Sequence, residues 1–480
     1  MKQLNAKMSV LAAAILVSAC GSVGKDYQRP NFDTPASIGQ INSNKPVSTV
    51  NFKQWWKSFH DPVLDKLLDE ADANSQDLKL AVARMAEAKA TFDAGASNHY
   101  PIVDGTFSDV RNRYSRTGSR LGIPSASIYS LYNIGINASY EIDFWGKFAR
   151  ADEANKARLL AQSANRDLAQ SALYASIAQT YFALRAADGQ LRLAQDALKF
   201  RQENFNLQKR RFDAGSIGAL DLHQAESEVL SAEVAVAQAK QTVALNETSL
   251  AVLVGRSPAA ITQGAIPRGK SIDELYQELQ LPADLPSDLL SRRPDLAAAE
   301  QTLIAANAEI GQVKAQYFPS IRLTAGTGYE SRALRDLFDP ISWFWNLGSS
   351  ITQPLFRAGA IGAAVAGAEA RQQSALAQYS KAVQEAFRDV HDALTNSEAN
   401  DQIHIATEQR VKALKDSWRL ADLRYKNGYS AYLEVLSAQR DVLQAEGSLI
   451  ETKRAHLAAL IGVYKAIGGG WEKTPEFTQR

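Results

Sequence analysis

The sequence holds one cysteine, Cys20, among its 480 residues. A single cysteine excludes a disulfide framework within the chain and any metal site built from several thiolates. Long apolar runs are missing after residue 19, where no stretch approaches the roughly 20 apolar residues that a membrane-spanning helix needs. An excess of one charge is missing too, because 53 lysines and arginines are balanced by 52 aspartates and glutamates. This balance gives no indication of a nucleic-acid partner.

Catalytic and cofactor-binding motifs are also absent. The six histidines are scattered, and none has a histidine or cysteine three or four residues away, the spacing of a helical metal site. The glycine run 468–470 is followed by neither a helix nor a Lys-Ser/Thr pair, so it does not resemble a phosphate-binding loop. A Gly-x-Ser-x-Gly motif does not occur. We therefore expect no enzyme activity, no cofactor and no metal site.

The amino terminus resembles the signal of a bacterial lipoprotein. A basic start, a short apolar core over residues 10–17 and a few small residues precede Cys20. In such signals residues 1–19 are removed, and the cysteine carries acyl chains that anchor the protein, with about 0.8 kcal/mol for each buried CH₂. Gly21 stands where an aspartate usually means inner-membrane retention, which favours the outer membrane. The alternative is an ordinary secretory signal with an incidental cysteine.

The sequence repeats itself with a period near 215 residues. The stretch Arg211-Phe-Asp-Ala-Gly215 matches Arg424-Tyr-Lys-Asn-Gly428, and each copy ends on a similar Leu-Val/Ile-Gly triplet. This period is too long for a solenoid, so it indicates two copies of one large unit. We expect a lipid-anchored segment over 20–60, a first repeat over 61–255, a linker over 256–290, a second repeat over 291–463 and a carboxy-terminal segment over 464–480.

Each copy has the same predicted order of elements. A helix of about 25 residues is stopped by a proline, and two strands around a polar loop follow. A very long helix then leads through a glycine turn into a shorter one. The predicted helices cover 74–97, 147–212 and 220–253 in the first copy, and 295–316, 363–425 and 432–463 in the second.

The strands are predicted from period-2 alternation of apolar and polar residues. Alternation is strict over 132–142 and 321–329, less strict over 343–355 and weak over 102–114. We therefore expect strands near 102–114, 129–142, 320–330 and 343–355. Lengths of about 10 to 13 residues suit strands that cross a membrane. The alternative is a soluble four-stranded sheet with one wet face. Six aromatic residues occupy positions that suit a membrane-interface girdle: Tyr129, Tyr132, Tyr140, Tyr329, Trp343 and Trp345.

Four strands per chain predict an oligomer. The smallest outer-membrane barrels use about eight strands, and an open sheet edge in lipid would leave backbone groups unpaired at several kcal/mol each. Two, three or four chains would therefore have to pool their strands. A helix of about 65 residues would extend roughly 100 Å, far more than a single small core needs. A coiled-coil spacer would use such helices, but it would not need the strands.

Several motifs resemble the outer-membrane factor family, in particular the TolC/OprM-type and NodT-like efflux lipoproteins. The resemblance covers nearly the whole mature chain, from about Tyr27 to Trp471. The motifs that carry it are Asp143-Phe-Trp-Gly146, Arg293-Pro-Asp295, Ala305-Ala-Asn-Ala-Glu-Ile-Gly311, Tyr317-Phe-Pro-Ser-Ile321 and Tyr464-Lys-Ala-Ile-Gly-Gly-Gly-Trp471.

This resemblance implies an α+β membrane protein that forms a homotrimer. Four strands per protomer would build one 12-stranded transmembrane β-barrel, continuous with a periplasmic α-helical barrel. It implies an outer-membrane exit channel of a Gram-negative tripartite efflux system, fed by a periplasmic adaptor (membrane fusion) protein and an inner-membrane RND-type pump. A mixed equatorial belt would come from segments near 35–65, 256–290 and 464–480, and the loops 115–128 and 331–342 would face the exterior.

The resemblance also assigns residues to a gate at the periplasmic tips, around the two turn glycines. Asp221 and Tyr425 align with a pair that joins neighbouring helices in the family, so we expect a hydrogen bond between them. Leu433 and Glu434 fall on constriction positions, whereas Ser437 replaces a frequent aspartate and Arg440 could pair with an acid. The alternative is that Asp221 and Glu434 are ordinary solvated helix acids and that Tyr425 serves ordinary packing. Candidates for adaptor contact are Arg210, Arg211, Gly215, Arg424, Lys426 and Gly428.

Two other functions compete with the efflux channel. One is a structural periplasmic coiled-coil lipoprotein, and the other is the exit duct of a protein-secretion system. The cysteine-containing signal and the Gly-Gly-Gly-Trp ending resemble the efflux branch more closely. The residues do not distinguish drugs, metals or dyes as cargo, because the upstream pump would select it.

Overall fold

The structure is a computed structural model. Contacts divide the chain into two compact units, and each unit takes residues from both sequence copies. Unit 1 combines residues 1–31, 85–161 and 299–379, and unit 2 combines 32–84, 162–298 and 380–480. The expected signal peptide, Cys20 and most of loop 115–128 lie outside the described residues. Those described are 22–33, 35, 37–40, 52–113, 128–276, 284–286 and 293–469.

Four helices contribute residues to both units: α3 (Gln76–Ala96), α4 (Lys147–Asp213), α8 (Pro294–Lys314) and α9 (Ala360–Lys426). The bounds of α4 and α9 lie within three residues of the two long helices predicted from the sequence. Among the described residues, no helix is both long and apolar enough to cross a membrane.

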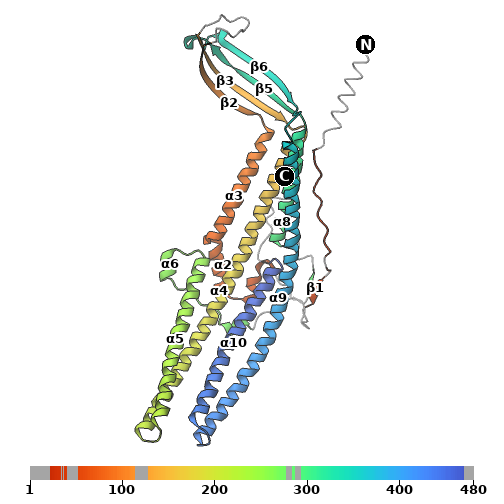
Figure 1. The fold of residues 1–480 in the computed structure, drawn as a ribbon. Coiled ribbons are helices and arrows are strands. Elements are labelled where there is room, and N and C mark those ends of the chain that lie inside the picture. The colour runs from red at the N-terminus through yellow and green to blue at the C-terminus, as the bar shows by residue number, and fades with distance from the viewer. Residues whose placement is uncertain are drawn as a thin grey trace. The chain divides into compact units, whose positions relative to one another are not determined.

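Unit 1 contains one antiparallel sheet in the order β2-β3-β5-β6 (Figure 1). The register is unbroken, and the two edge strands are β2 and β6. The last strand ends at Thr352 rather than at the predicted residue 355, because Pro354 has no N–H to donate to a ladder. The strands are β2 (Ile102–Arg113), β3 (Ile128–Ile142), β5 (Ser320–Ser331) and β6 (Trp343–Thr352).

The helices of unit 1 join the strands at one end of the sheet (Figure 1). Pro101 and Pro319 separate helix from strand in the two copies, after the short turns η2 (Ser97–His99) and η4 (Ala315–Tyr317). The indole of Trp145 donates to the carbonyl of Pro319 at 2.8 Å, which fixes the junction. At the opposite end, β5 and β6 are connected through η5 (Leu334–Asp336) and η6 (Pro340–Ser342).

Unit 2 contains two helical hairpins, α4–α5 and α9–α10, whose tips lie at the same end of the unit (Figure 1). Its other helices and strands are short. They include α2, which lies before the predicted helix 74–97 and was not expected; Asp61 accepts hydrogen bonds from Val63 N and Leu64 N and so begins this helix. The bounds are β1 (Ser37–Gln40), η1 (Phe52–Phe59), α2 (Pro62–Asn74), α5 (Ala219–Leu253), α6 (Pro258–Gln263), α7 (Ile272–Tyr276), β4 (Asp284–Pro286) and α10 (Tyr432–Ala466).

The core of unit 2 is aromatic and lies where η1 and α2 pack on α4 and α10. Trp55 stacks on Tyr464 with ring centroids 5.7 Å apart, and Phe59 packs edge-on against Phe182 at 4.8 Å. Burial raises the pKa of the Tyr464 hydroxyl to about 12. This short-element region also holds the pairing of β1 with β4, the mixed α/β composition expected of a belt.

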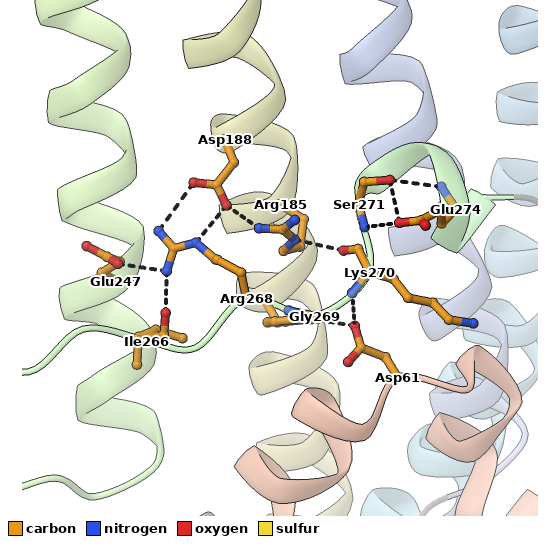
Figure 2. Close-up of polar contacts among 11 residues, drawn as sticks. Asp61, Arg185, Asp188, Glu247, Ile266, Arg268, Gly269, Lys270, Ser271 and Glu274 are labelled. Carbon is orange, nitrogen blue, oxygen red and sulfur yellow. Dashed lines mark hydrogen bonds and ion pairs between the residues drawn. The ribbon is translucent and has the colours of Figure 1, made fainter.

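An ionic strap, residues 266–271, fastens the short-element region onto the hairpin α4–α5. Figure 2 shows Arg268 between Asp188 of α4 and Glu247 of α5, at 2.8 and 2.7 Å. The backbone N–H of Lys270 donates to Asp61 at 3.0 Å, so the same carboxylate that caps α2 also holds the strap. A β-carbon at Gly269 would lie 2.2 Å from that carboxylate, so only glycine fits here.

Candidate functional site

The sheet of unit 1 has two chemically distinct faces, which the register defines. One face carries the even-numbered residues of β3 and their direct partners on the other strands, and we call it the apolar face. Its middle is formed by Phe107, Ile134, Ile136, Ala138, Leu323, Ala325, Trp345 and Leu347. The other face, the polar face, carries Thr106, Ser108, Asn133, Asn137, Thr324, Asn346 and Ser350.

The polar face is hydrogen-bonded across the strands, and one acidic residue, Asp104, lies opposite Asn137 near its middle. Asn137 donates to the hydroxyl of Thr106 at 3.0 Å. The other charged side chains lie towards the ends, where Arg322 lies 3.6 Å from Glu141 and Asn133 reaches Glu330 at 3.5 Å. Four positions have no side chain at all: Gly135, Gly326, Gly328 and Gly348.

Thr327, a polar residue in the middle of the apolar face, has its hydrogen bonds satisfied locally. Thr327 donates from its hydroxyl to the carbonyl of Phe344 at 3.1 Å and accepts from the indole of Trp343, also at 3.1 Å. A face with its polar groups satisfied in this way suits contact with lipid, whereas the opposite face suits water.

The hairpin tips of unit 2 are closed by glycine turns of the same design. Gly215 and Gly428 have φ of +72° and +75°, a conformation that side chains rarely adopt. Ser216 N–H donates to the carbonyl of Arg211, and Tyr429 N–H donates to that of Arg424, at 2.8 and 2.9 Å. The turns predicted from the duplicated sequence are therefore present, and a β-carbon at either glycine would point into open space.

Side-chain contacts join one hairpin to the other near these tips. Arg211 of α4 donates to the hydroxyl of Tyr425 of α9 at 3.0 Å, and its guanidinium lies 5.9 Å from the ring centroid. The hydrogen bond expected between Asp221 and Tyr425 is not found among the described contacts of this chain. The tyrosine hydroxyl accepts instead from Arg211, whose side chain projects from the last turn of α4 towards α9.

Two further polar contacts link the hairpins deeper along the helices. Asn204 of α4 donates to the hydroxyl of Tyr432 of α10, and burial raises the pKa of that tyrosine. Arg440 of α10 forms an ion pair with Glu228 of α5, and this hydrogen bond raises the pKa of the arginine. Glu228 is almost fully buried and also binds Arg201 of α4 at 3.2 Å.

The structure thus separates the predicted gate residues into two groups. Tyr425 and Arg440 take part in the contacts between the hairpins, and Arg440 has the acidic partner that the sequence suggested. Leu433, Glu434 and Ser437 lie exposed on α10. Asp221 is half-buried in the first turn of α5, with no ion pair among the described residues of its own chain.

Sequence reasoning missed Glu228, Arg201, Asn204 and Tyr432. Their partners lie up to 228 residues away, so no local pattern identifies them. The duplication offered one indication, because Tyr432 opens the second-copy helix at the place where the first copy has Ala219.

The six candidates for adaptor contact lie at or beside the two turns. Arg210 and Arg424 are exposed, whereas Arg211 is half-buried under its contact with Tyr425. Lys426 pairs within its own helix with Asp422 at 2.6 Å.

Comparison with known proteins agrees with these features. The family described as "Outer membrane efflux protein" matches residues 67–256 and 285–469, two stretches that overlap the two sequence copies. The chain is 33% identical over 481 residues to the probable efflux pump outer membrane protein TtgC of Pseudomonas putida, covering 98% of this chain and 97% of that one. It is 31% identical over 471 residues to the cation efflux system protein CusC of Escherichia coli, covering 97% and 99%.

A solved structure has the same fold. The CmeC outer membrane channel of Campylobacter jejuni superposes with a TM-score of 0.88 at 26% identity, covering 95% of this chain and 97% of that one. This likeness confirms the expected fold class, a trimeric outer-membrane channel with four strands from each chain, and with it the expected function as an exit channel for efflux. The chain belongs to the outer membrane efflux protein family.

Proposed function

We propose that the polar face of the sheet lines the exit duct of a tripartite efflux system and that the hairpin tips are its gate. In this proposal a periplasmic adaptor and an inner-membrane RND-type pump deliver the cargo, and the channel conducts it passively. The observation that carries the proposal is the set of contacts between the hairpins: Arg211 to Tyr425, Asn204 to Tyr432 and Arg440 to Glu228. These contacts have to break if one hairpin moves away from the other.

The strength of these contacts suits a reversible gate. A hydrogen bond contributes about 0.5–1.5 kcal/mol net, and an ion pair with one exposed partner about 0–1 kcal/mol. Three contacts repeated in three chains add up to several kcal/mol, which is comparable with the roughly 5.5 kcal/mol that moves a two-state equilibrium from 1:99 to 99:1. Adaptor binding can supply an amount of this size.

The exposed residues of the tips complete the gate in this proposal. Leu433 narrows the passage, and Glu434 gives it negative charge, while Ser437 adds none. Asp221, which has no ion pair within its own described chain, meets a neighbouring protomer. The exposed arginines Arg210 and Arg424 contact the adaptor together with the turns at Gly215 and Gly428.

Conductance in a planar bilayer tests the gate. We expect the wild-type trimer to open rarely, and Asp221→Ala with Glu434→Ala to give a large and steady conductance. The matched control is Lys426→Gln, because it breaks the ion pair with Asp422 inside α9 without joining or separating the hairpins. Steady wild-type conductance that none of the variants changes would keep the pore and reject this gate. Folded trimers that never conduct would favour the structural spacer.

Adaptor docking is tested separately by copurification from cells. Charge reversal at the two exposed arginines, Arg210→Glu with Arg424→Glu, should reduce the adaptor recovered with a tagged channel while conductance remains. Unchanged recovery would remove these residues from the docking surface.

A further inference from the structure

The sheet has an outer end that its connections identify. The helices of unit 1 join the strands at one end, and Arg113, Ile128 and the connection 332–342 lie at the other. Outer-membrane barrels have their long loops outside the cell and their short turns in the periplasm. The end with Arg113, Ile128, Ser331 and Trp343 therefore faces outward in an outer-membrane channel.

The height of the apolar face fits the hydrocarbon layer. From Ile142 to Tyr132 the face runs about ten residues, roughly 33 Å along the strand and about 25 Å when the strand is tilted. Tyr132, Tyr329 and Trp343 mark its outer limit, because they lie on the same face at paired or adjacent positions.

Two arginines continue this same face beyond the outer limit. Arg111 pairs with Ser130 and Arg113 pairs with Ile128, so both point to the lipid side of β2 at the height of headgroups. They lie about 7 Å apart along the strand. Asp109, the next residue inward on this face, is its acidic residue. One acid against two arginines leaves an excess of positive charge at the edge of the face.

Neither arginine has a partner in the described part of the chain. Thr327 on the same face is satisfied by Phe344 and Trp343, and Arg335 in the outer connection is paired with Asp336 at 3.2 Å. Arg111 and Arg113 are exposed, and no hydrogen bond or ion pair reaches them within the residues that the structure describes. Two unpaired cations at a membrane interface call for an anion that comes with the lipid.

We propose that Arg111 and Arg113 form a binding site for the phosphate groups of a phosphorylated, multiply acylated lipid of the outward-facing leaflet, the class to which lipid A belongs. The phosphates lie against the two guanidinium groups, and the acyl chains descend along Phe107, Ile134 and Ile136 of the apolar face. The proposal rests on the sheet crossing the outer membrane, as the proposed function requires.

Native mass spectrometry of the full-length trimer, with diphosphoryl lipid A added, tests the site. We expect Arg111→Gln with Arg113→Gln to weaken lipid A binding roughly tenfold or more. Arg111→Lys with Arg113→Lys should retain most of the binding, because the charge remains. Arg335→Gln is the matched control, an exposed arginine at the same end that should leave the affinity unchanged. Lipid A stripped of its phosphates should bind the wild type as weakly as diphosphoryl lipid A binds the glutamine variant.

Three outcomes would overturn the site. The glutamine variant could bind lipid A like the wild type, phosphate-free lipid A could bind as tightly as lipid A, or the variant could lose the trimer because the arginines pair with a neighbouring chain. Conductance measurements distinguish failure of the lipid site from failure of the proposed channel function. A trimer that conducts and ignores the arginine changes rejects the lipid site alone, whereas a protein that neither inserts nor conducts rejects the channel.

Discussion

The sheet and the hairpin tips hold together in opposite ways. The sheet relies on an unbroken backbone ladder, and its two faces follow from the alternation of residues along each strand. The tips rely on a few side chains from distant parts of the sequence, such as Arg211 with Tyr425 and Arg440 with Glu228. A ladder that loses one side chain keeps its geometry, whereas a tip that loses one contact changes the balance between two states. The proposed function thus combines a permanent wall with an adjustable mouth.

The largest expected effect comes from disrupting the apolar face of the sheet. Ile136→Arg places a charge in the middle of the apolar face, where an arginine costs about 2–4 kcal/mol in each chain. Asn137→Arg, the next residue, points to the polar face and should be tolerated. Heat-modifiable trimer in outer-membrane fractions is the measurement. Equal losses from both substitutions would contradict the assignment of the two faces.

The next smaller effect tests whether the contacts between the hairpins control opening or general stability. Glu228→Gln removes the charge that holds Arg440 and Arg201, at a cost of about 1–2 kcal/mol after allowing for the exposure of Arg440. We expect an increased open fraction in single-channel records with the trimer intact. Loss of the trimer instead would make Glu228 a residue of general stability and not of the gate.

Acid should affect the sheet and the helices of unit 2 differently, because the two differ in histidine. The four strands contain none, whereas in unit 2 the ring of Tyr276 contacts His404 and His456 at 4.2 and 5.0 Å. Burial lowers the pKa of both histidines, although Asp401 opposes it at each of them, and Lys453 lowers that of His404 further. The unfolded chain therefore binds protons first as pH falls below about 6.5, and the free energy of unfolding decreases there but not above it.

Thermal unfolding between pH 7.5 and 5 checks this expectation. The helical signal should lose stability as pH falls through about 6.5, and His456→Phe should remove part of that loss. His391→Phe, at an exposed position on α9, is the control and should leave the pH profile unchanged. A helical transition independent of pH would contradict the role given to the buried pair.

The smallest expected effect refines the gate. Tyr425→Phe removes the hydroxyl that accepts from Arg211 but keeps the ring against Tyr432, at 5.4 Å between centroids. The cost should be about 0.5–1 kcal/mol, visible as a modest rise in open probability. Tyr425→Ala should open the channel further because it also removes the ring. Identical effects of the two variants would assign the contact to the hydroxyl alone.

How much the sequence predicted differs between the two regions for the same physical reason. The strands and long helices were predictable because alternation, prolines and turn glycines are local, and β3 covers Ile128–Ile142 against a predicted 129–142. The helix α2 was missed, because the predicted helix began only at residue 74, although Asp61 followed by Pro62 is a helix-start signal. The partner of Tyr425 could not be predicted, since Asp221 and Arg211 both lie near the same turn and only packing decides between them.

The four glycines of the polar face have a consequence for whatever passes along it. Gly135 lies opposite Gly328, and Gly326 and Gly348 lie nearby on the same face, so the peptide backbone itself forms part of the wall. Backbone without side chains forms no pocket in which a passing molecule could bind, and it leaves room for the molecule's own hydration shell. The duct would then work as a smooth, unselective conduit, and discrimination among cargoes would fall to the machinery that loads it.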